Sequence, residues 1–343
     1  MCERHEGAGP VRAMVLERPG HIALHTVQEP DAEADHVRLQ IGAVGVCGTD
    51  RSIYRGSIPV RYPRVLGHEI VGTIMEQVGG WTPGDRAIVD PNVVCGVCAR
   101  CTEGRENLCE RGWLLGRDRD GGMQETMRVP VANLHRVPLG LPDHLAPLIQ
   151  VLSTCQHAHE MARSMAGACV VVIGLGVSGL LHVQLAAAAG ASMVIGVSRS
   201  PAKRTLGKTL GADVTISAAL PDVRERINEV HAGGGDIVIE CVGTAATLAQ
   251  AVHLTRYGGE IVAYGTITET EATFPFYELY HKELVISNPR AATRVDVAAA
   301  LETVTRGSVD LAPLVTDRVS FDRVDHVLAA GAGADSLKTV IEP

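Results

Sequence analysis

Four cysteines lie close together in one short stretch of the chain. They follow the pattern Cys95-x-x-Cys98-x-x-Cys101-x7-Cys109, with glycines in the spacers that let the chain wrap. Four thiolates at such spacing can close a tetrahedral site around Zn²⁺. Because sulfur would fill all four positions, neither water nor substrate would reach the metal. The pattern therefore predicts a structural zinc ion, against the alternative of four buried cysteines without a metal.

A second set of metal-binding residue types lies earlier, in Cys47, His68 and Glu69. A cysteine, a histidine and a carboxylate on neighbouring loops provide three zinc ligands and leave one position open to water or substrate. Taken singly, each residue also fits an ordinary role: a small core residue, a satisfied polar group and a surface charge. Together they predict a catalytic zinc ion, because catalysis by a metal requires an open position.

A glycine motif follows an apolar run in the middle of the chain. Residues 170–173 are Val-Val-Val-Ile, and they lead into Gly174-x-Gly176-x-x-Gly179 and then into an apolar helical stretch. The first glycine allows a tight turn, the second lets the backbone approach a pyrophosphate, and the third permits close packing of helix on sheet. The strand and helix around the motif favour dinucleotide binding over a merely structural turn.

The end of the next expected strand indicates which dinucleotide binds. NAD-binding domains place an acidic residue there, on the ribose 2′-hydroxyl. This chain has Ser198 and Arg199 instead, with Lys203 and Arg204 one turn later, a set suited to a 2′-phosphate. A solvated helix start is the alternative, but a helix N-terminus favours acidic rather than basic residues. The sequence therefore favours NADP(H) over NAD(H).

The elements that must position these residues change in character along the chain. Short β-rich runs punctuated by glycine and proline fill the first third, at 12–16, 36–43, 70–78 and 86–89. From about residue 150, apolar strands alternate with Ala-rich helices. The expected strands are 169–173, 193–197, 236–241 and 260–264, and the expected helices are 179–189, 202–210 and 245–255. This alternation predicts an α/β fold with a Rossmann-type, doubly wound parallel sheet.

The end of the chain is too short to form a domain of its own. It holds one helical stretch, 295–306, and a β-like ending at 339–341. We therefore expect it to pack back on the amino-terminal region. The predicted domains are a mostly β zinc-binding domain at 1–152 and 289–343, with the structural zinc lobe at 91–112, and an inserted dinucleotide-binding domain at 153–288.

Composition excludes several classes of protein. The chain has 343 residues, 46% of them hydrophobic, which predicts about two folded domains. Thirty-one basic against 39 acidic residues give a net charge of −8 without a basic run, so no nucleic-acid partner is expected. Glycines and polar residues interrupt the longest apolar stretch, so no membrane span is expected. The polar first ten residues lack a signal peptide, and we expect a cytoplasmic protein.

The motifs together resemble those of the zinc-containing medium-chain alcohol dehydrogenases, in the branch of the sorbitol, threonine and glucose dehydrogenases. The resemblance runs essentially from end to end. It is carried by Cys47-Gly-Thr-Asp50, Gly67-His-Glu69, Gly84-Asp85-Arg86, the four cysteines, the glycine motif and Asp236-x-x-x-Glu240-x-x-Gly243. The resemblance implies a GroES-like fold for the mostly β domain.

On the zinc side, the resemblance implies a role for each matching residue. Cys47 and His68 would ligate the catalytic zinc, and Glu69 would be an exchangeable ligand. Asp50 would orient His68, and Thr49 would take the proton of the substrate hydroxyl.

On the cofactor side, the resemblance implies contacts along the whole dinucleotide. Val177 belongs to the glycine motif, and Thr154 matches a residue that packs on the nicotinamide ring. Lys203 matches a residue that reaches the adenosine ribose.

Two positions depart from the family pattern. Gln150 stands where relatives place a further zinc-site Cys or Glu, and an amide oxygen is a weaker ligand than either. Ser52 stands where many relatives have a histidine that carries the proton to solvent. Hydride transfer needs neither of the residues that are missing.

The resulting hypothesis is a zinc-dependent oxidoreductase that transfers hydride between NADP(H) and an alcohol or carbonyl compound. With 3% aromatic residues, a polar substrate such as a polyol, sugar, cyclitol or amino alcohol is favoured. The alternatives are a reductase of an activated iminium or alkene on the same fold, and a non-catalytic protein that binds zinc and nucleotide. A homodimer or homotetramer is expected.

Overall fold

The computed structural model describes residues 9–29, 35–331 and 333–343. It divides into two compact units, which are described separately below. The first comprises Met1–Val151 and Leu311–Pro343, and the second comprises Leu152–Asp310. Within the described ranges, no helix combines the length and the apolar character needed to cross a bilayer.

Antiparallel strands dominate the first unit. One sheet has the order β2-β1-β4, and a seven-stranded sheet has the order β10-β6-β5-β3-β18-β17, with β9 also paired to β3. In β3, Val37, Leu39 and Ile41 are buried, as expected for a strand with one face on the core. The strands are β1 (Pro10–Arg18), β2 (His21–Gln28), β3 (His36–Gly45), β4 (Arg64–Val65), β5 (Glu69–Ile74), β6 (Arg86–Val89), β9 (Thr126–Pro130) and β10 (Leu134–Arg136).

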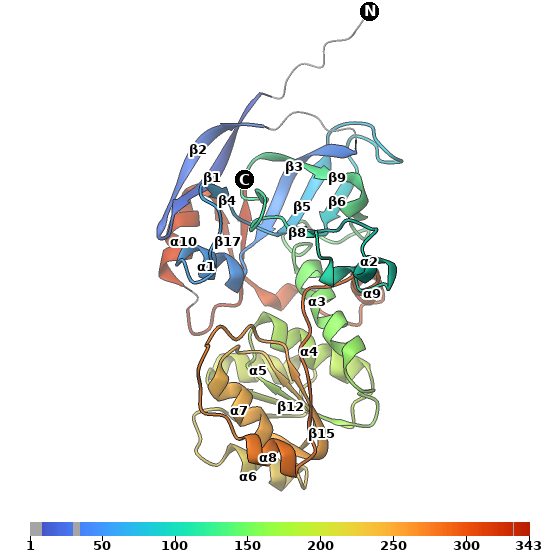
Figure 1. Ribbon diagram of the computed structural model, residues 1–343, viewed down its shortest axis with the longest axis vertical. Helices are drawn as coiled ribbons and strands as arrows, with labels where there is room; N and C mark the ends of the chain where they lie inside the picture. Colours follow the sequence, from blue (N-terminus) through green and yellow to red (C-terminus); the bar gives the residue numbers. More distant parts are fainter. Residues whose placement is uncertain (1–8, 30–34, 332) are drawn as a thin grey trace, which may run out of the picture. The chain divides into compact units, whose positions relative to one another are not determined.

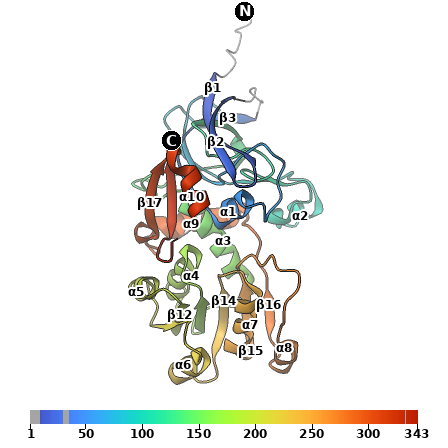
Figure 2. The same cartoon turned by 90° about the vertical axis from the view of Figure 1, so that its left-hand side faces the viewer.

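The last residues of the chain complete this sheet. Strand β18 (Lys338–Glu342) runs antiparallel to β3, with Val340 opposite Gly45, and parallel to β17 (Val315–Ser320). Helix α10 (Val324–Ala330) packs against α1 (Gly48–Tyr54), and Figure 2 shows the two side by side. From residue 311 on, the chain therefore belongs to the same unit as the amino-terminal region.

A small lobe within the first unit carries the four zinc-binding cysteines. Strands β7 (Asn92–Val93) and β8 (Trp113–Leu114) pair and close the base of the lobe. The short helix α2 (Ala99–Thr102) lies between them in sequence. A lobe without a large apolar core needs another source of stability, and a metal ion held by the four cysteines would supply it.

A parallel six-stranded sheet forms the centre of the second unit, as predicted. Its order is β13-β12-β11-β14-β15-β16, and the order reverses between β11 and β14. Every residue of β11 is buried, as expected for a strand covered on both faces. The strands are β11 (Cys169–Ile173), β12 (Met193–Ser198), β13 (Val214–Ser217), β14 (Gly235–Glu240), β15 (Thr255–Ala263) and β16 (Val285–Ser287).

Helices pack against this sheet (Figure 1). Helix α4 contacts β11 and β12, α5 contacts β12 and β13, and α7 contacts β14 and β15. The helices are α3 (Leu148–Met161), which starts in the first unit, α4 (Val177–Ala188), α5 (Pro201–Thr209), α6 (Val223–Val230), α7 (Ala245–Leu254), α8 (Phe276–His281) and α9 (Arg294–Thr305).

The predicted domain boundary at residue 289 differs from the structure, because α9 belongs to the second unit. Two hydrogen bonds tie α9 to α3: Gln156 Nε2 donates to Thr303 Oγ1 at 2.7 Å, and His157 Nδ1 lies 3.0 Å from Asp296 Oδ2. Spacing along the sequence gives no sign of these long-range bonds.

Candidate functional site

The four cysteines of the lobe meet around one point. Their sulfur atoms all lie within 4.8 Å of one another, with Cys98 3.5 Å from Cys101 and 3.8 Å from Cys109, and Cys95 4.0 Å from Cys101. Zn–S bonds of about 2.3 Å in a tetrahedron require sulfur separations of about 3.8 Å. The cluster therefore has the dimensions of a closed zinc site.

Backbone N–H groups favour the thiolate form at Cys95 and Cys98, whereas burial raises the pKa of the Cys101 thiol to about 12. The N–H of Cys98 donates to Cys95 Sγ at 3.4 Å, and the N–H of Cys95 donates to Cys109 Sγ at 3.3 Å. Donors from Val97 and Cys98 lower the pKa of the Cys95 thiol to about 6. Neighbouring thiolates repel one another, and a divalent cation relieves that repulsion. The donor set thus fits zinc.

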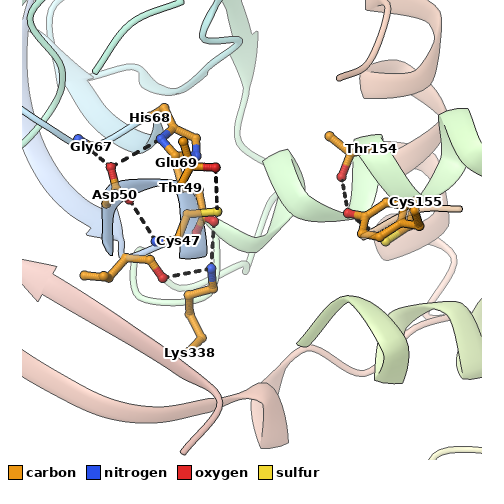
Figure 3. A network of polar contacts seen from close by, with 11 residues as sticks. Cys47, Thr49, Asp50, Gly67, His68, Glu69, Thr154, Cys155 and Lys338 are labelled. Atoms are coloured by element: carbon orange, nitrogen blue, oxygen red, sulfur yellow. Dashed lines mark hydrogen bonds and ion pairs between the residues drawn. The ribbon is translucent and has the colours of Figure 1, made fainter. Parts of the chain in front are cut away.

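The second predicted cluster also forms. One ligand atom each from Cys47, His68 and Glu69 lies within 4.8 Å of the others (Figure 3). Cys47 is the residue before α1, and Glu69 begins β5. His68 and Glu69 are buried, whereas Cys47 is partly exposed. A thiol, an imidazole and a carboxylate at this spacing fit three ligands of a catalytic zinc ion.

Asp50 supports the Cys47, His68 and Glu69 cluster through contacts with neighbouring backbone N–H groups and with the His68 ring. Its carboxylate accepts the N–H of Cys47 at 2.8 Å and the N–H of Gly67 at 3.2 Å, and it lies 3.4 Å from Nδ1 of His68. Asp50 is fully buried, which by itself raises the pKa of its carboxyl, but His68 and the two N–H donors bring that pKa below its usual value. A carboxylate at Nδ1 leaves Nε2 of His68 to bind a metal, as the resemblance implies.

Lys338 is a member of this cluster that the sequence analysis missed. Its ammonium lies 2.6 Å from Glu69 Oε1 and donates to the Val46 carbonyl at 3.2 Å (Figure 3). Both side chains of the ion pair are buried. Burial lowers the pKa of Lys338, but the charge of Glu69 outweighs it, so that pKa is raised overall. The available signal was a lysine at the start of the short strand β18, next to the buried Thr339, Val340 and Ile341.

The other oxygen of Glu69 occupies a space that only glycine leaves open. A Cβ at position 45 would overlap Glu69 Oε2, because Gly45 and Glu69 are opposite each other in β3 and β5. Within the described part of the chain, this buried oxygen has no hydrogen-bond partner. A buried carboxylate oxygen without a donor is costly, and a cation beside it offsets that cost.

The remaining residues predicted for the zinc site lie in two helices. Thr49 is in the first turn of α1, with its Oγ1 3.9 Å from Cys47 Sγ. Ser52 follows in the same helix and is partly exposed. Gln150 is partly exposed near the start of α3. The roles of Ser52 in proton transfer and of Gln150 as a ligand stay predictions.

In the second unit, the glycine motif has the geometry that a dinucleotide requires. Gly174 has φ +91°, which favours glycine, and a Cβ at Gly179 would overlap the Gly174 carbonyl oxygen. Gly176 precedes α4 and Val177 is its first residue, so the helix N-terminus faces the loop. Backbone N–H groups and the helix dipole at this point fit a pyrophosphate.

The end of β12 presents the predicted basic residues. Ser198 is buried at the last position of the strand, and Arg199 after it is exposed. Nη1 of Arg204 donates to the carbonyls of Ser198 at 2.8 Å and Arg199 at 2.9 Å. This folds the guanidinium back over the strand end. Lys203, whose backbone N–H is capped by Ser200, lies in the first turn of α5, and its contact with the ribose stays a prediction.

Thr154, predicted to contact the nicotinamide, lies in α3. Its Oγ1 is 2.7 Å from the hydroxyl of Tyr264, a residue that the sequence analysis did not select. No motif marks Tyr264, because it follows directly after β15 and meets Thr154 only in the folded chain.

Comparison with known proteins agrees with this geometry. The model of the alcohol dehydrogenase GroES-like domain family matches residues 33–139, and that of the zinc-binding dehydrogenase family matches residues 176–306. A zinc-type alcohol dehydrogenase-like protein of Haemophilus influenzae is 32% identical over 93% of this chain and 94% of its own length. The sorbitol dehydrogenase of Halalkalibacterium halodurans is 31% identical over 94% of this chain and 96% of its own.

A solved structure has the same fold. A protein from Sinorhizobium meliloti described as a zinc-binding dehydrogenase, crystallised with NADP, is 33% identical, with a TM-score of 0.92. The match covers 98% of this chain and 100% of that one. The chain therefore belongs to the zinc-type medium-chain alcohol dehydrogenase family, and it is an oxidoreductase of the alcohol dehydrogenase type.

Proposed function

We propose that this protein is a zinc-dependent oxidoreductase that transfers hydride between NADP(H) and a polar alcohol or carbonyl compound. The convergence of Cys47, His68 and Glu69 supports the proposal most strongly. Three ligands leave a zinc ion one open position, which a substrate oxygen can take. The closed four-cysteine cluster offers no such position.

When bound, zinc supplies a Lewis acid, and NADP(H) supplies the hydride chemistry. Cys47 and His68 would hold the metal, and Asp50 keeps the imidazole oriented through Nδ1. Thr49, in the first turn of α1, takes the proton of the substrate hydroxyl at Oγ1. Ser52 passes that proton on toward solvent.

The charges around the metal keep it electrophilic. The Cys47 thiolate and the Glu69 carboxylate carry two negative charges, and the Lys338 ammonium at 2.6 Å from Glu69 removes one of them. Gln150 adds none. Fewer negative charges beside zinc make it a stronger Lewis acid, which favours ionisation of an alcohol in one direction and polarises a carbonyl in the other.

Residues at the end of β12 support NADP(H) as the cofactor. An acid at the strand end would repel a 2′-phosphate, whereas Ser198 and Arg199 can donate hydrogen bonds to it. Arg204, folded back over the same strand end, adds positive charge. The related protein from Sinorhizobium meliloti, which was crystallised with NADP, supports the same choice.

Composition and one relative support a polar substrate. The chain contains only three Phe and two Trp, too few for an aromatic-walled pocket suited to bulky apolar alcohols. A sorbitol dehydrogenase is among the relatives at 31% identity. Polyols, sugars, cyclitols and amino alcohols are therefore the substrates we favour. We place the reaction in the cytoplasm, whose reducing conditions keep the zinc-binding cysteines as thiols.

The test combines metal analysis with a substrate panel on the purified protein. Two zinc ions per chain, and turnover of at least one polyol, sugar, cyclitol or amino alcohol with NADP⁺, are expected. One zinc ion per chain and no turnover would favour the non-catalytic alternative. Reduction of an iminium or alkene by NADPH, without alcohol oxidation, would favour the other alternative.

A further inference from the structure

The strand order of the second unit indicates where each half of a dinucleotide lies. The pyrophosphate belongs at the glycine motif after β11, at the point where the order reverses. Ser198 and Arg199, at the end of β12, mark the adenosine side. The nicotinamide half must then extend to the opposite side, over the carboxyl ends of β14 and β15. Tyr264 directly follows β15 and therefore lies on the nicotinamide side.

Tyr264 is bonded to the residue predicted to contact the nicotinamide. Its hydroxyl lies 2.7 Å from Thr154 Oγ1 and 3.7 Å from Cys155 Sγ. Figure 3 shows Thr154 and Cys155 beside each other, with a dashed line from the Thr154 hydroxyl. Thr154 and Tyr264 are both partly exposed, so a ligand can reach them, whereas Cys155 is buried behind them.

The ring of Tyr264 is fixed by a pair of histidines. It meets the ring of His182 edge-on, with centroids 4.7 Å apart and an interplanar angle of 82°. His182 is fully buried and stacks on His159, whose Nε2 lies 3.0 Å from His182 Nδ1. Burial lowers the pKa of His159 to about 4 and also lowers that of His182, so both rings are neutral near pH 7. The Tyr264 ring is thus held in place by a buried pair of hydrogen-bonded, neutral histidine rings.

The hydrogen bond between Tyr264 and Thr154 matters because the helix backbone alone does not fix the side-chain rotamer of a threonine. In helices, threonine divides between two rotamers, since its hydroxyl can turn back to a carbonyl of the preceding turn. A bond from Thr154 Oγ1 to a rigid neighbour selects one of the two rotamers. It thereby also fixes the Thr154 methyl group.

We propose that Tyr264 is a positioning residue for the nicotinamide half of the cofactor, and that it acts through the Thr154 hydroxyl. The inference rests on the proposed dinucleotide cofactor but not on the choice between NADP(H) and NAD(H). The inference concerns only the nicotinamide half of the cofactor. Its test can therefore distinguish binding of that half from binding of the adenosine half.

The experiment compares Tyr264→Phe with wild-type protein in binding two ligands, NADPH and 2′-phospho-ADP-ribose, which lacks the nicotinamide. Phenylalanine keeps the ring contact with His182 and removes only the hydroxyl. Loss of the bond to Thr154 should weaken NADPH binding about three- to tenfold and leave 2′-phospho-ADP-ribose binding unchanged, although the hydroxyl also contacts Cys155 and Ser178. Tyr257→Phe is the matched control, because Tyr257 lies in β15 with its side chain exposed, and it should change neither affinity.

Thr154→Val tests whether Tyr264 acts on the cofactor through the Thr154 hydroxyl. If Tyr264 acts through Thr154, Tyr264→Phe should cause no further loss of NADPH affinity in the Thr154→Val background. Unchanged NADPH binding by Tyr264→Phe would overturn the inference. Equal weakening of both ligands together with a lower Tm would also overturn it, because that result indicates a general structural role. If wild-type protein prefers NAD(H), the cofactor choice is wrong, and the same comparison is made with NADH and ADP-ribose.

Discussion

At the scale of single residues, the catalytic cluster depends on how buried charges are compensated. Glu69 begins β5 with its carboxylate out of contact with solvent, and Lys338 is the cation that faces it. Removing one partner of a buried pair leaves the other uncompensated, which costs about 3–5 kcal/mol. A zinc ion beside Glu69 would supply positive charge at the same place. Lys338 and zinc should therefore partly substitute for each other.

This leads to a prediction for Lys338→Met. In zinc-free protein, the substitution should lower the free energy of unfolding by about 3 kcal/mol or more, and in zinc-loaded protein by clearly less. Urea unfolding with and without zinc measures both values. Arg12→Met is the control, because the Arg12–Glu125 pair is solvent-exposed and should contribute about 1 kcal/mol or less. Equal losses with and without zinc would contradict the proposed relation.

Cofactor choice is a second prediction at this scale. Charge-assisted hydrogen bonds contribute about 1.5–3 kcal/mol, so Arg199→Ala should raise the KM for NADP⁺ roughly ten- to a hundredfold, with little change for NAD⁺. Ser198→Asp should shift the preference toward NAD⁺, because a carboxylate repels the 2′-phosphate. Steady-state kinetics with both cofactors measure the effect. Arg226→Ala, an exposed arginine of α6, should behave as wild type. Unchanged NADP⁺ kinetics in Arg199→Ala would show that these basic residues only form a solvated helix start and do not bind the 2′-phosphate.

Which site residues the sequence reveals depends on how local their signal is. The cysteines of the lobe are close in sequence, and their spacing alone predicts a cluster that the structure contains. Lys338 and Tyr264 belong to no motif, and each meets its partner across more than a hundred residues of chain. Only the pairing of β18 with β3, and of α3 with the end of β15, brings them into place.

At the scale of elements, strands with mostly buried apolar residues were straightforward to predict from the sequence. The expected strands at 86–89 and 169–173 coincide with β6, in which three buried apolar residues follow Arg86, and with β11, which is apolar throughout. Strands β13 and β16 were not predicted, because each is short and its few apolar residues are interrupted or followed by Thr or Ser. Each is a strand only through pairing with its neighbour in the sheet.

The zinc lobe provides a prediction for an irregular element. Cys98→Ser should lower the zinc content by one equivalent per chain and lower the Tm, because a closed thiolate site contributes directly to folding. Metal analysis and thermal unfolding measure the two effects. Cys169→Ser is a control for the metal content alone, since Cys169 is buried in β11 of the other unit. Full zinc content in Cys98→Ser would show that the four cysteines do not form the metal site.

The packing of α3 on α4 through His159 and His182 predicts a dependence on pH. The pKa of His159 is about 4 in the folded protein against 6.5 for an ordinary histidine, so the unfolded chain binds the proton first. Stability is then complete above about pH 6.5 and is lost as the pH falls toward 4, with about 2 kcal/mol lost between pH 7 and pH 5. Urea unfolding of His159→Gln, which cannot titrate, should show about that much less acid sensitivity. His326→Gln, an exposed position in α10, serves as the control, and equal acid sensitivity in wild type and His159→Gln would refute the argument.

At the scale of the whole molecule, the chain combines a discontinuous unit with an inserted one. Val340 lies opposite Gly45 in the sheet, so the last strand is part of the same structure as the catalytic cluster. Removal of residues 338–343 would therefore take Lys338 and a strand from that sheet together. The alternation of strands and helices was enough to predict the inserted unit, whereas the placement of α9 depended on long-range hydrogen bonds to α3.

One edge of the parallel sheet supports the expected self-association. Strand β16 is an edge strand of the six-stranded sheet. Its side chains Val285 and Ile286 are 47% and 37% exposed. Phe276, Tyr277 and Tyr280 of the preceding helix α8 are more than 70% exposed. An exposed apolar edge strand tends to pair with another chain, and a second copy presents the same edge. We therefore expect a dimer that associates through β16.

Light scattering on the purified protein should give about twice the 36.3 kDa of one chain. Ile286→Lys should shift the mass to that of a monomer, because a charge on an edge strand opposes pairing. Leu220→Lys is the matched control. Leu220 is 42% exposed and follows β13, at the opposite edge of the same sheet, so this variant should remain a dimer. A monomeric wild type would disprove the association, and a dimeric Ile286→Lys protein would place the contact elsewhere on the chain.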